Sequence, residues 1–240
     1  MNEVAKEKLD GVFFGGDIVG YGAHPKECAQ LVKESGHPCV LGNHDSYVIE
    51  MEHRAHILAE DPEVHDNPVW MGILHSIQQT KGELLEWLRT LPFEVSLPGA
   101  QLAHAALHDQ EDWPYLSSPG DATPTLALLK EPVGFFGHTH QTQLFFDRAK
   151  PGRPKWIGRE WIEIPKDGTC AVTVGSVGQP RDGDHRSGWV IWDSDLMRVQ
   201  LRKTEYPEEA AAYAIIEAGL PSHSARRLLR RGAHLPWMSA

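Results

Sequence analysis

The stretch that decides the fold is Cys39-Val40-Leu41-Gly42-Asn43-His44-Asp45. Its first three residues form a short apolar run, which predicts a buried strand. Its last four residues supply a turn, an amide oxygen, an imidazole and a carboxylate. Because an α/β sheet presents side chains to ligands at the ends of its strands, the stretch predicts a strand that ends in a site.

Two further stretches have the same character. Gly16-Asp17 follows the apolar run Val12-Phe13-Phe14, and Gly137-His138-Thr139-His140 follows Val133-Gly134-Phe135-Phe136. Between residues 14 and 39, Pro25 suits the first turn of a helix and Gly36 its end. A strand, a helix and a second strand in this order indicate a parallel sheet. Asp, Asn and His at the ends of separate strands then predict a metal site with hydrolytic chemistry.

The rest of the chain predicts an α/β (α+β) fold. We expect the tail of a helix over residues 1–10, helices and loops over 46–80 that form a partial lid on the site, and a capping box at 80–83 that starts another helix. Strands are predicted over residues 94–97, 100–105, 133–137, 142–147, 155–164, 169–174, 188–193 and 198–204, with one helix starting near Thr123-Pro124. Two helices at about 207–231 close the chain. With no repeat or linker, residues 1–240 are expected to form a single domain.

Composition limits the classes of function. The 240 residues carry a formal net charge of −10, which argues against broad nucleic-acid binding, because that needs a basic face. A small phosphate substrate is compatible with this charge, since bound cations reverse the local field. No apolar run approaches the roughly 18 residues of a membrane span, and no signal segment opens the chain. The three cysteines have unrelated spacings, so we expect no disulfide framework, no membrane and a cytoplasmic location.

The residues at the first two strand ends each have a plainer interpretation beside the functional one. Asp17 would ordinarily form a turn or cap a helix, but the glycines before it let ligands approach closely, and a carboxylate suits a bridge between two divalent cations. Asn43 and His44 would ordinarily cap a loop. After Gly42, we interpret Asn43 as an oxygen ligand and His44 as an acid that protonates a leaving group. Asp45 would then orient the imidazole.

The remaining candidates are histidines. In extended backbone, residues i and i+2 point the same way, so His138 and His140 can face one metal cluster; the alternative is a polar loop. His104 lies in the apolar run Leu102-Ala103-His104-Ala105-Ala106-Leu107, where a hydrogen-bonded core histidine is the ordinary interpretation. The other clusters favour ligation by His104.

The order Gly-Asp, Gly-Asn-His-Asp, His, Gly-His-Thr-His resembles the calcineurin-like metallophosphoesterase superfamily. The wider sequence is similar to its small bacterial phosphodiesterase branch at residues 16–22, at His104 with Asp112, Tyr115 and Leu116, at 175–184, and in the last two helices at 218–221 and 226–228. The resemblance covers nearly the whole chain. It implies two packed mixed β-sheets flanked by helices, a four-layer sandwich with a dinuclear metal site at the strand ends.

The resemblance also implies a role for each candidate. Asp17 would bridge two divalent metal ions, and Mn, Fe and Zn all suit the ligand set. Asn43, His104 and His138 would complete one metal, and His140 would bind the other. His44 would be the general acid, oriented by Asp45, and a metal-bound hydroxide would attack phosphorus in line. The substrate would be a small phosphoester or nucleotide-like molecule.

One part of the family pattern is missing from this sequence. The family begins with a strand that ends in Asp-x-His, and both side chains bind the first metal, but no such motif precedes Asp17. We therefore expect the chain to lack that first strand. The first metal would keep only Asp17 and His140 from the protein, which predicts weak binding. The unpaired edge at 12–14 would favour a homodimer or lower stability.

Substrate residues are predicted around a Gly-Asp-Gly loop. Arg181 and Arg186 flank this loop, and either could hold a phosphate oxygen; a solvated turn is the alternative. Tyr21 lies close to Asp17 in sequence and could line the same cleft. The arginines at 226, 227, 230 and 231 form a basic stretch, which we interpret as the solvent face of a helix.

Two functions from different classes follow. The first is a metal-dependent phosphoesterase, most simply a phosphodiesterase, because His44, Asp45 and five candidate ligands are all present. The second is a catalytically weakened binding or scaffold module that keeps the fold without a complete dinuclear site, which the missing Asp-x-His favours. A structural zinc protein is disfavoured because the sequence has no cysteine cluster.

Overall fold

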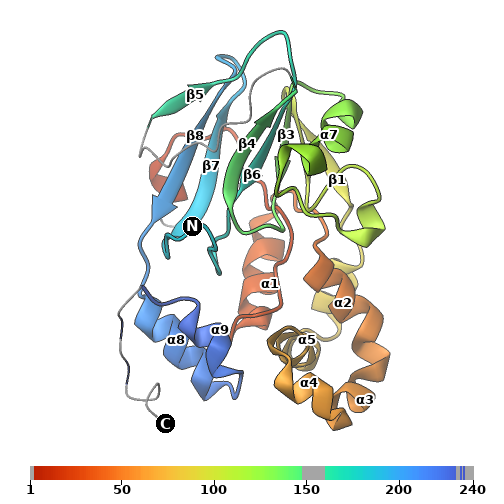
Figure 1. Ribbon diagram of the computed structural model, residues 1–240. Coiled ribbons are helices and arrows are strands. Elements are labelled where there is room, and N and C mark those ends of the chain that lie inside the picture. The colour runs from red at the N-terminus through yellow and green to blue at the C-terminus, as the bar shows by residue number, and fades with distance from the viewer. Residues whose placement is uncertain (1–2, 148–159, 231–232, 234, 236–240) are drawn as a thin grey trace.

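The computed structural model describes residues 3–147, 160–230, 233 and 235. Within them, the strands form two sheets (Figure 1). The first sheet has five strands in the order β1 (Glu94–Leu97), β2 (Ala100–Ala103), β3 (Val133–Phe136), β6 (Cys170–Val174) and β4 (Thr142–Phe146). The second has three strands in the order β5 (Trp161–Glu163), β8 (Arg198–Thr204) and β7 (Ser187–Asp193). The first sheet is mixed, since β2, β3 and β6 run parallel while β1 and β4 are antiparallel edges.

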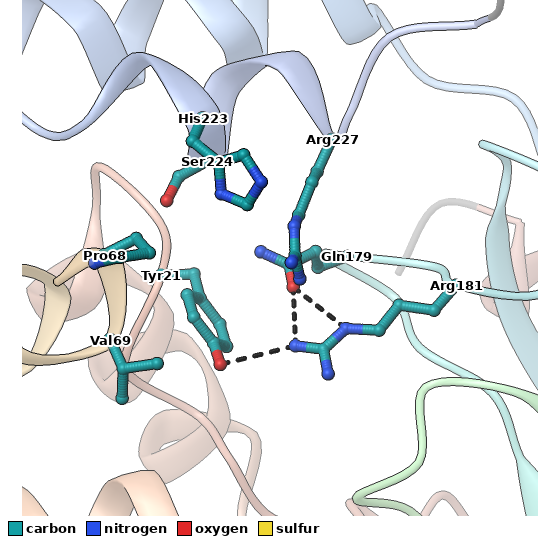
Figure 2. A pocket seen from close by; sticks show the side chains of 8 residues that line it. All are labelled: Tyr21, Pro68, Val69, Gln179, Arg181, His223, Ser224 and Arg227. Atoms are coloured by element: carbon teal, nitrogen blue, oxygen red, sulfur yellow. Dashed lines mark hydrogen bonds between the residues drawn. The ribbon is translucent and has the colours of Figure 1, made fainter.

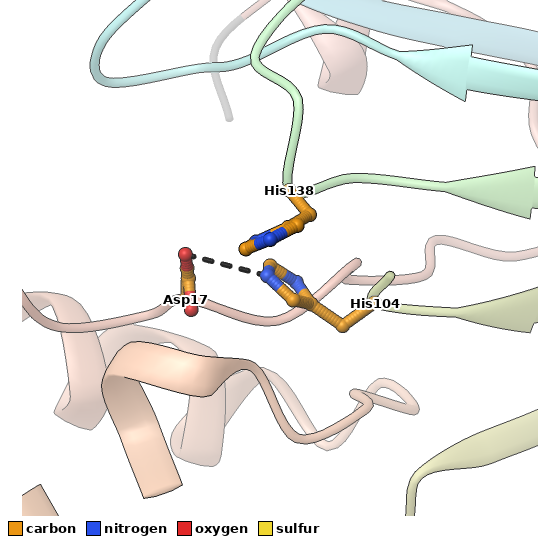
Figure 3. A group of neighbouring side chains, drawn as sticks. All are labelled: Asp17, His104 and His138. Atoms are coloured by element: carbon orange, nitrogen blue, oxygen red, sulfur yellow. Dashed lines mark ion pairs between the residues drawn. The ribbon is translucent and has the colours of Figure 1, made fainter. Parts of the chain in front are cut away.

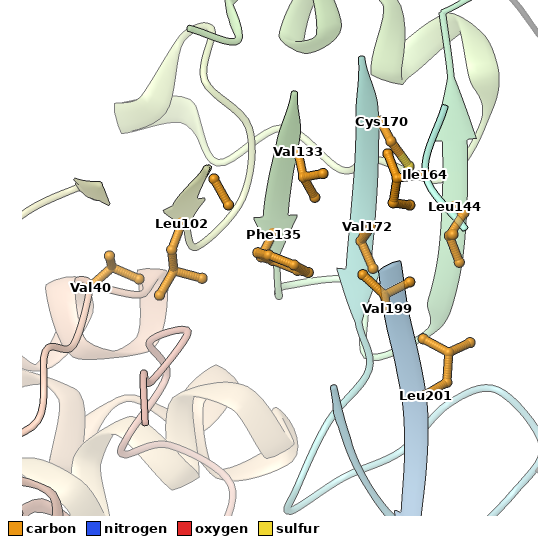
Figure 4. Close-up of a cluster of buried hydrophobic side chains, with 11 residues drawn as sticks. Val40, Leu102, Val133, Phe135, Leu144, Ile164, Cys170, Val172, Val199 and Leu201 are labelled. Atoms are coloured by element: carbon orange, nitrogen blue, oxygen red, sulfur yellow. The ribbon is translucent and has the colours of Figure 1, made fainter. Parts of the chain in front are cut away.

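The alternation of side chains along the strands builds a core on each face of the first sheet. In β3, Val133 and Phe135 point to one face, while Phe136 points to the other, as the two-residue period of a strand requires. The first face meets the second sheet in one buried cluster that includes Leu102, Val172, Val199 and Leu201 (Figure 4). On the other face, helix α7 (Pro119–Leu128) covers Ala103, Phe136, Phe145 and Ala171. Two packed sheets flanked by helices were predicted, and this is confirmed. The first sheet is mixed as expected, whereas the strands described in the second are all antiparallel.

A second core consists almost entirely of helices and supports the site from the other half of the molecule. The elements are α1 (Pro25–Ser35), α2 (Asn43–Met51), η2 (Glu52–Arg54), α3 (Ala55–Glu60), α4 (Pro62–Asp66), α5 (Pro68–Gln79) and α6 (Glu83–Leu88). Their buried faces pack together around Val48, Ile73, Ile77 and Leu88. Residues 46–80 therefore form helices that share this core with α1 and α6.

The last two helices are α8 (Glu208–Glu217) and α9 (Ser222–Arg226). Ala212, Ile215, Leu220 and Leu228 form their shared core, and Met71 of α5 packs against it. This contact places α8 and α9 at the same end of the molecule as α1–α5 (Figure 1). In the described part of the chain, no helix is both long and apolar enough to cross a membrane.

The structure corrects several local predictions. Residues 12–14 and 39–41 are not strands of either sheet, because a single parallel bridge, between Phe14 and Cys39, joins them. Residues 1–10 contain only the 3-10 turn η1 (Val4–Lys6) among their described positions. The strand predicted over 155–164 is observed only at 161–163, and residues 155–159 lie outside the described range.

Two predicted helix starts are also wrong. The Thr80 hydroxyl does not cap α6, because it donates to Ser76 O at the end of the preceding helix, over 2.5 Å. Gly82 occupies the capping position of α6 instead. Helix α7 starts at Pro119 rather than near 123, because Ser118 and Asp121 form a capping box ahead of the apolar stripe. Both errors concern polar residues whose hydrogen-bond partner the sequence pattern left open.

Candidate metal centre

The candidate ligands come from four places along the chain. Asp17 follows the extended residues that end at Phe14, and Asn43 opens α2. His104 follows β2, and His138 and His140 lie between β3 and β4. Because β2 and β3 are parallel, their carboxyl ends meet at one edge of the sheet. The four segments therefore converge at the edge where the sequence predicted the site.

Three predicted ligands form a compact group. One ligand atom from each of Asp17, His104 and His138 lies within 4.8 Å of the others (Figure 3). His104 Nε2 lies 3.4 Å from Asp17 Oδ2 and 3.2 Å from Asn43 Oδ1. In the described part of the chain, no other group of three or more His, Cys, Asp or Glu side chains meets this distance.

The hydrogen bonds around this group leave lone pairs that suit a cation. A carbonyl can only accept, so His104 Nδ1 donates to Gly15 O over 2.6 Å. Burial alone would lower the pKa of His104, but Asp17 outweighs burial and raises that pKa, which favours a proton on Nε2. A metal ion would displace this proton, and the Nε2 lone pair then faces the oxygens of Asp17 and Asn43. His138 Nε2 is buried without a hydrogen-bond partner. Two nitrogens and two oxygens that all offer lone pairs fit a divalent metal ion, and imidazole with carboxylate is a common donor set for one.

His140 is held beside this group but is not part of it. Its Nδ1 donates to Gln179 O over 2.7 Å, which leaves the Nε2 lone pair available to a second ion. Burial lowers the pKa of both His138 and His140 to about 4; a positive neighbour, His104 for one and Arg181 for the other, adds to the effect. Both rings are therefore neutral near pH 7, the form in which histidine binds metals.

Electrostatics and backbone strain both concentrate here. Burial alone would raise the pKa of Asp17, but His104 and His44 outweigh it and hold that pKa well below its usual range. Asp17, His138 and His140 have φ values of 52°, 58° and 56°. Such left-handed conformations cost about 1–3 kcal/mol each and persist where the surroundings impose them, often at functional sites.

His44 lies next to the ligand group. Its backbone N–H donates to Asp17 Oδ1 over 2.9 Å, and its ring centroid is 4.5 Å from that of Tyr21. Its Nδ1 is buried without a hydrogen-bond partner. The position expected of a proton donor is therefore occupied by an imidazole whose ring is fixed by packing.

Asp45 does not make the contact predicted for it. Its Oδ1 accepts the N–H groups of Ile18 and Val19 over 2.9 and 3.2 Å, and its Oδ2 accepts that of Gly42 over 3.0 Å. His44 Nδ1 has no hydrogen-bond partner among the described residues, so it does not donate to Asp45. Asp45 ties the Asp17 loop to the start of α2, so it positions the site through the backbone.

The predicted substrate residues separate into two groups. Tyr21 and Arg181 meet, since Arg181 Nη2 donates to Tyr21 Oη over 3.3 Å. Both line a cavity of about 190 Å³ beside the metal centre (Figure 2). Arg186 instead forms a bidentate pair with Asp184, with contacts of 2.6–3.2 Å.

Sequence reasoning missed six residues of this cavity, namely Pro68, Val69, Gln179, His223, Ser224 and Arg227. Gln179, His223 and Arg227 line it together with Tyr21 and Arg181. The basic stretch at 226–231 was the available signal, and we interpreted it as a solvent face. Arg227 is exposed, as that interpretation expects, and it also lines the cavity beside Gln179 and Arg181, which come from a loop earlier in the chain.

Comparisons with known proteins agree with this geometry. A family model for calcineurin-like phosphoesterases matches residues 1–142. An uncharacterized protein of Methanocaldococcus jannaschii is 28% identical over 232 residues, which are 95% of this chain and 89% of that protein. The crystal structure of a metallophosphoesterase from Sphaerobacter thermophilus is 27% identical, with a TM-score of 0.81 and coverage of 94% of this chain and 90% of that one.

A hypothetical protein from Pyrococcus horikoshii, 15% identical, has the same fold, with a TM-score of 0.74 and coverage of 97% of this chain and 90% of that one. The family model spans more than half of the sequence. Its match begins ahead of the Asp17 loop and ends beyond His140, so it includes every candidate ligand. The chain therefore belongs to the calcineurin-like phosphoesterase family of metal-dependent hydrolases.

Proposed function

We propose that the protein is a metal-dependent phosphodiesterase that hydrolyses a P–O bond, with His44 as the general acid. One observation carries the proposal. Ligand atoms of Asp17, His104 and His138 lie within 4.8 Å of one another, and Asn43 Oδ1 lies 3.2 Å from His104 Nε2. His44 adjoins this group, because its backbone N–H donates to Asp17 Oδ1 over 2.9 Å. A proton donor next to a cation site is what cleavage of a phosphoester requires.

Each residue of the site has a role in the proposed reaction. Asp17, Asn43, His104 and His138 would hold one divalent ion, and His140 with Asp17 would contact a second. When bound, such ions stabilise the negative charge that develops on a phosphoryl group. Gly15 O and Gln179 O fix the tautomers of His104 and His140, so both rings present Nε2 to the site.

His44 needs a proton to act as the acid. Burial lowers the pKa of His44, and the Asp17 carboxylate opposes that effect. A bound phosphate anion adds a negative charge beside the ring, which favours the imidazolium in the substrate complex. The packing of Tyr21 on the ring keeps it directed at the site during this change.

The metal is proposed to be Mn, Fe or Zn, since each accepts oxygen and imidazole ligands. The substrate is proposed to be a small phosphoester, and the acidic balance of the chain disfavours broad binding of nucleic acid. All three cysteines are free, which supports the proposed cytoplasmic location. A homodimer stays a prediction, and light scattering at several protein concentrations would check it.

Hydrolysis of bis(4-nitrophenyl) phosphate with added Mn²⁺ tests the proposal. We expect metal-dependent turnover by the wild type and a loss of about 10²–10⁴-fold in kcat for His44→Ala, the range for removal of a general acid. His56→Ala is the matched control, because His56 is an exposed histidine on α3 and should leave turnover unchanged. Absence of Mn²⁺-dependent hydrolysis by the wild type would refute the proposal that the protein is an enzyme. Equal rates for wild type and His44→Ala would refute only the role of His44.

A second candidate is a binding module with one ion and little turnover. It is favoured by the position of His140 outside the single three-residue ligand group found among the described residues. Metal analysis separates the two candidates. One tightly held ion per chain together with no hydrolysis supports the module, whereas turnover above the His44→Ala level supports the enzyme.

A further inference from the structure

A cavity next to the metal centre has no role in the function proposed above. It lies between the start of α5, the loop that precedes β7, and α9 (Figure 2). Its volume is about 190 Å³, and it is lined by Tyr21, Pro68, Val69, Gln179, Arg181, His223, Ser224 and Arg227. Four separate parts of the chain, including the loop that carries Tyr21, therefore contribute to one concave surface.

The cavity shares a wall with the metal centre. The Tyr21 ring lies 4.5 Å from the His44 ring and 6.2 Å from the His140 ring, centroid to centroid. The Arg181 backbone N–H donates to His140 O over 2.9 Å, while Gln179 O accepts from the His140 ring. Tyr21, Gln179 and Arg181 therefore belong both to the cavity lining and to the surroundings of the metal centre.

The cavity is positively charged, and that charge is not neutralised by carboxylates. Among the described residues, the Arg181 side chain donates only to neutral acceptors, namely Gln179 Oε1 over 2.8 Å and Tyr21 Oη over 3.3 Å. Arg227 forms no ion pair with the described residues, whereas Arg186, Arg202 and Arg230 each pair with a carboxylate. Two unpaired guanidinium groups that meet in one cavity, in a chain of net charge −10, select for an anion.

The rest of the lining suggests which anion. Arg181 and Arg227 can donate several hydrogen bonds to one planar or tetrahedral oxyanion, and Ser224 adds a buried hydroxyl. The Tyr21 ring that packs on His44 also lines the cavity, so the cavity adjoins the place where the proposed function puts the reacting phosphate. Tyr21, Pro68 and Val69 supply an apolar wall beside the charges, which suits the organic part of such a molecule.

We propose that this cavity binds a second phosphate group of the substrate, so that the preferred substrates are nucleotide-like phosphoanhydrides rather than esters with one phosphate. The inference rests on the proposed phosphodiesterase function for the position of the first phosphate. Arg227 and Arg181 are specificity residues in this account. They contact the part of the substrate that does not react.

Calorimetric binding to the Mn²⁺-loaded protein tests the inference without turnover. The probes are the non-hydrolysable α,β-methylene adenosine diphosphate and adenosine monophosphate. We expect the wild type to bind the diphosphate analogue about tenfold more tightly, which corresponds to about 1.4 kcal/mol. Arg227→Ala should reduce the preference to near unity. Arg226→Ala is the matched control, because Arg226 is the exposed neighbour outside the cavity, and it should keep the preference.

Steady-state kinetics give the second arm. Hydrolysis of bis(4-nitrophenyl) phosphate, which has one phosphate, should be the same for wild type and Arg226→Ala, and urea denaturation of wild type, Arg226→Ala and Arg227→Ala shows whether the variants fold. Turnover without any diphosphate preference in the wild type would overturn the inference and leave the proposed function intact. A diphosphate preference without turnover would instead overturn the proposed function. If wild type, Arg227→Ala and Arg226→Ala all preferred the diphosphate analogue equally, the cavity could not be the source of that preference.

Discussion

At the scale of the residue, Gly20 sets the position of the His44 ring. A Cβ at this position would lie 2.5 Å from His44 Nδ1, and its φ of +134° disfavours any side chain. We predict that Gly20→Ala displaces the ring and lowers kcat by about 10²-fold or more, as loss of a general acid does, while Mn²⁺ binding is retained. Gly22→Ala is the control, because nothing lies within 4 Å of a Cβ there. Unchanged kcat in Gly20→Ala would contradict the role given to His44.

The lowered pKa of His138 predicts that the stability of the protein depends on pH. Burial and the nearby His104 lower its pKa to about 4, against about 6.5 in an unfolded chain. The folded state thus favours the neutral ring, and its contribution to stability is lost as pH falls from about 6.5 to 4. In EDTA, the difference in free energy of unfolding between wild type and His138→Gln should shrink by a few kcal/mol over this range, by urea denaturation. If the difference in free energy of unfolding between the two proteins did not change with pH, this prediction would be wrong.

Single residues show what the sequence could predict. Asp17, Asn43, His104 and His138 were expected together because each follows an apolar run, and parallel strands bring such ends to one edge. The partners of Asp45 were not predictable in the same way. A carboxylate can accept from an imidazole or from backbone amides, and only the course of the 17–19 loop decides that it meets Ile18 and Val19.

At the scale of the element, helix α5 is fitted closely against the loop that carries Tyr21. Gly72 faces this loop, and a Cβ there would lie far inside van der Waals contact with Gly20 O. The Ser76 hydroxyl accepts from Gly20 N over 3.2 Å and donates to Gly72 O over 2.8 Å. The helix that was predicted as part of a lid therefore supports the His44 side of the site.

This close packing predicts that replacing Gly72 by alanine destabilises the protein, although helix propensity alone predicts the opposite. Alanine is a better helix former than glycine by about 1 kcal/mol, yet Gly72→Ala should destabilise the protein by about 1–3 kcal/mol through overpacking. Gly120→Ala in α7 is the control, because a Cβ there meets only Ser118 Oγ at 3.6 Å, so it should be neutral or stabilising. Urea denaturation of both variants measures the effect. Stabilisation by both would show that α5 can move away from the loop.

Elements also mark the limit of sequence patterns. The apolar runs at 12–14 and 39–41 were expected as strands, but pairing at one residue pair is too short to join a sheet. The Thr80 hydroxyl was expected to cap α6, but it donates to the Ser76 carbonyl of the preceding helix instead. Runs in the middle of the chain, such as 133–136 and 170–174, were predicted well because both faces of their strands are buried.

At the scale of the whole molecule, the site depends on contacts between distant parts of the chain. The arrival of α9 beside the metal centre follows from the packing of Met71 on the core of α8 and α9. No periodicity in the sequence indicates that contact. The sequence therefore predicted Arg227 on the surface, where it lies, but could not show that it also lines the cavity. The strand ends could be predicted because the rules for parallel sheets place them, whereas no comparable rule places a terminal helix.

The metal centre joins these parts, so metal binding should stabilise the whole fold. Asp17, Asn43, His104 and His138 come from segments up to 121 positions apart, and an ion that binds them favours the folded state by mass action. At 100 times Kd, the gain is about 2.7 kcal/mol, or a rise of roughly 5–10 °C in Tm for a chain of this size. Calorimetry of the wild type with Mn²⁺ and with EDTA measures it. His138→Gln should lose most of the rise and the exposed-site control His56→Gln should keep it; an equal rise in both would place the stabilising ion elsewhere.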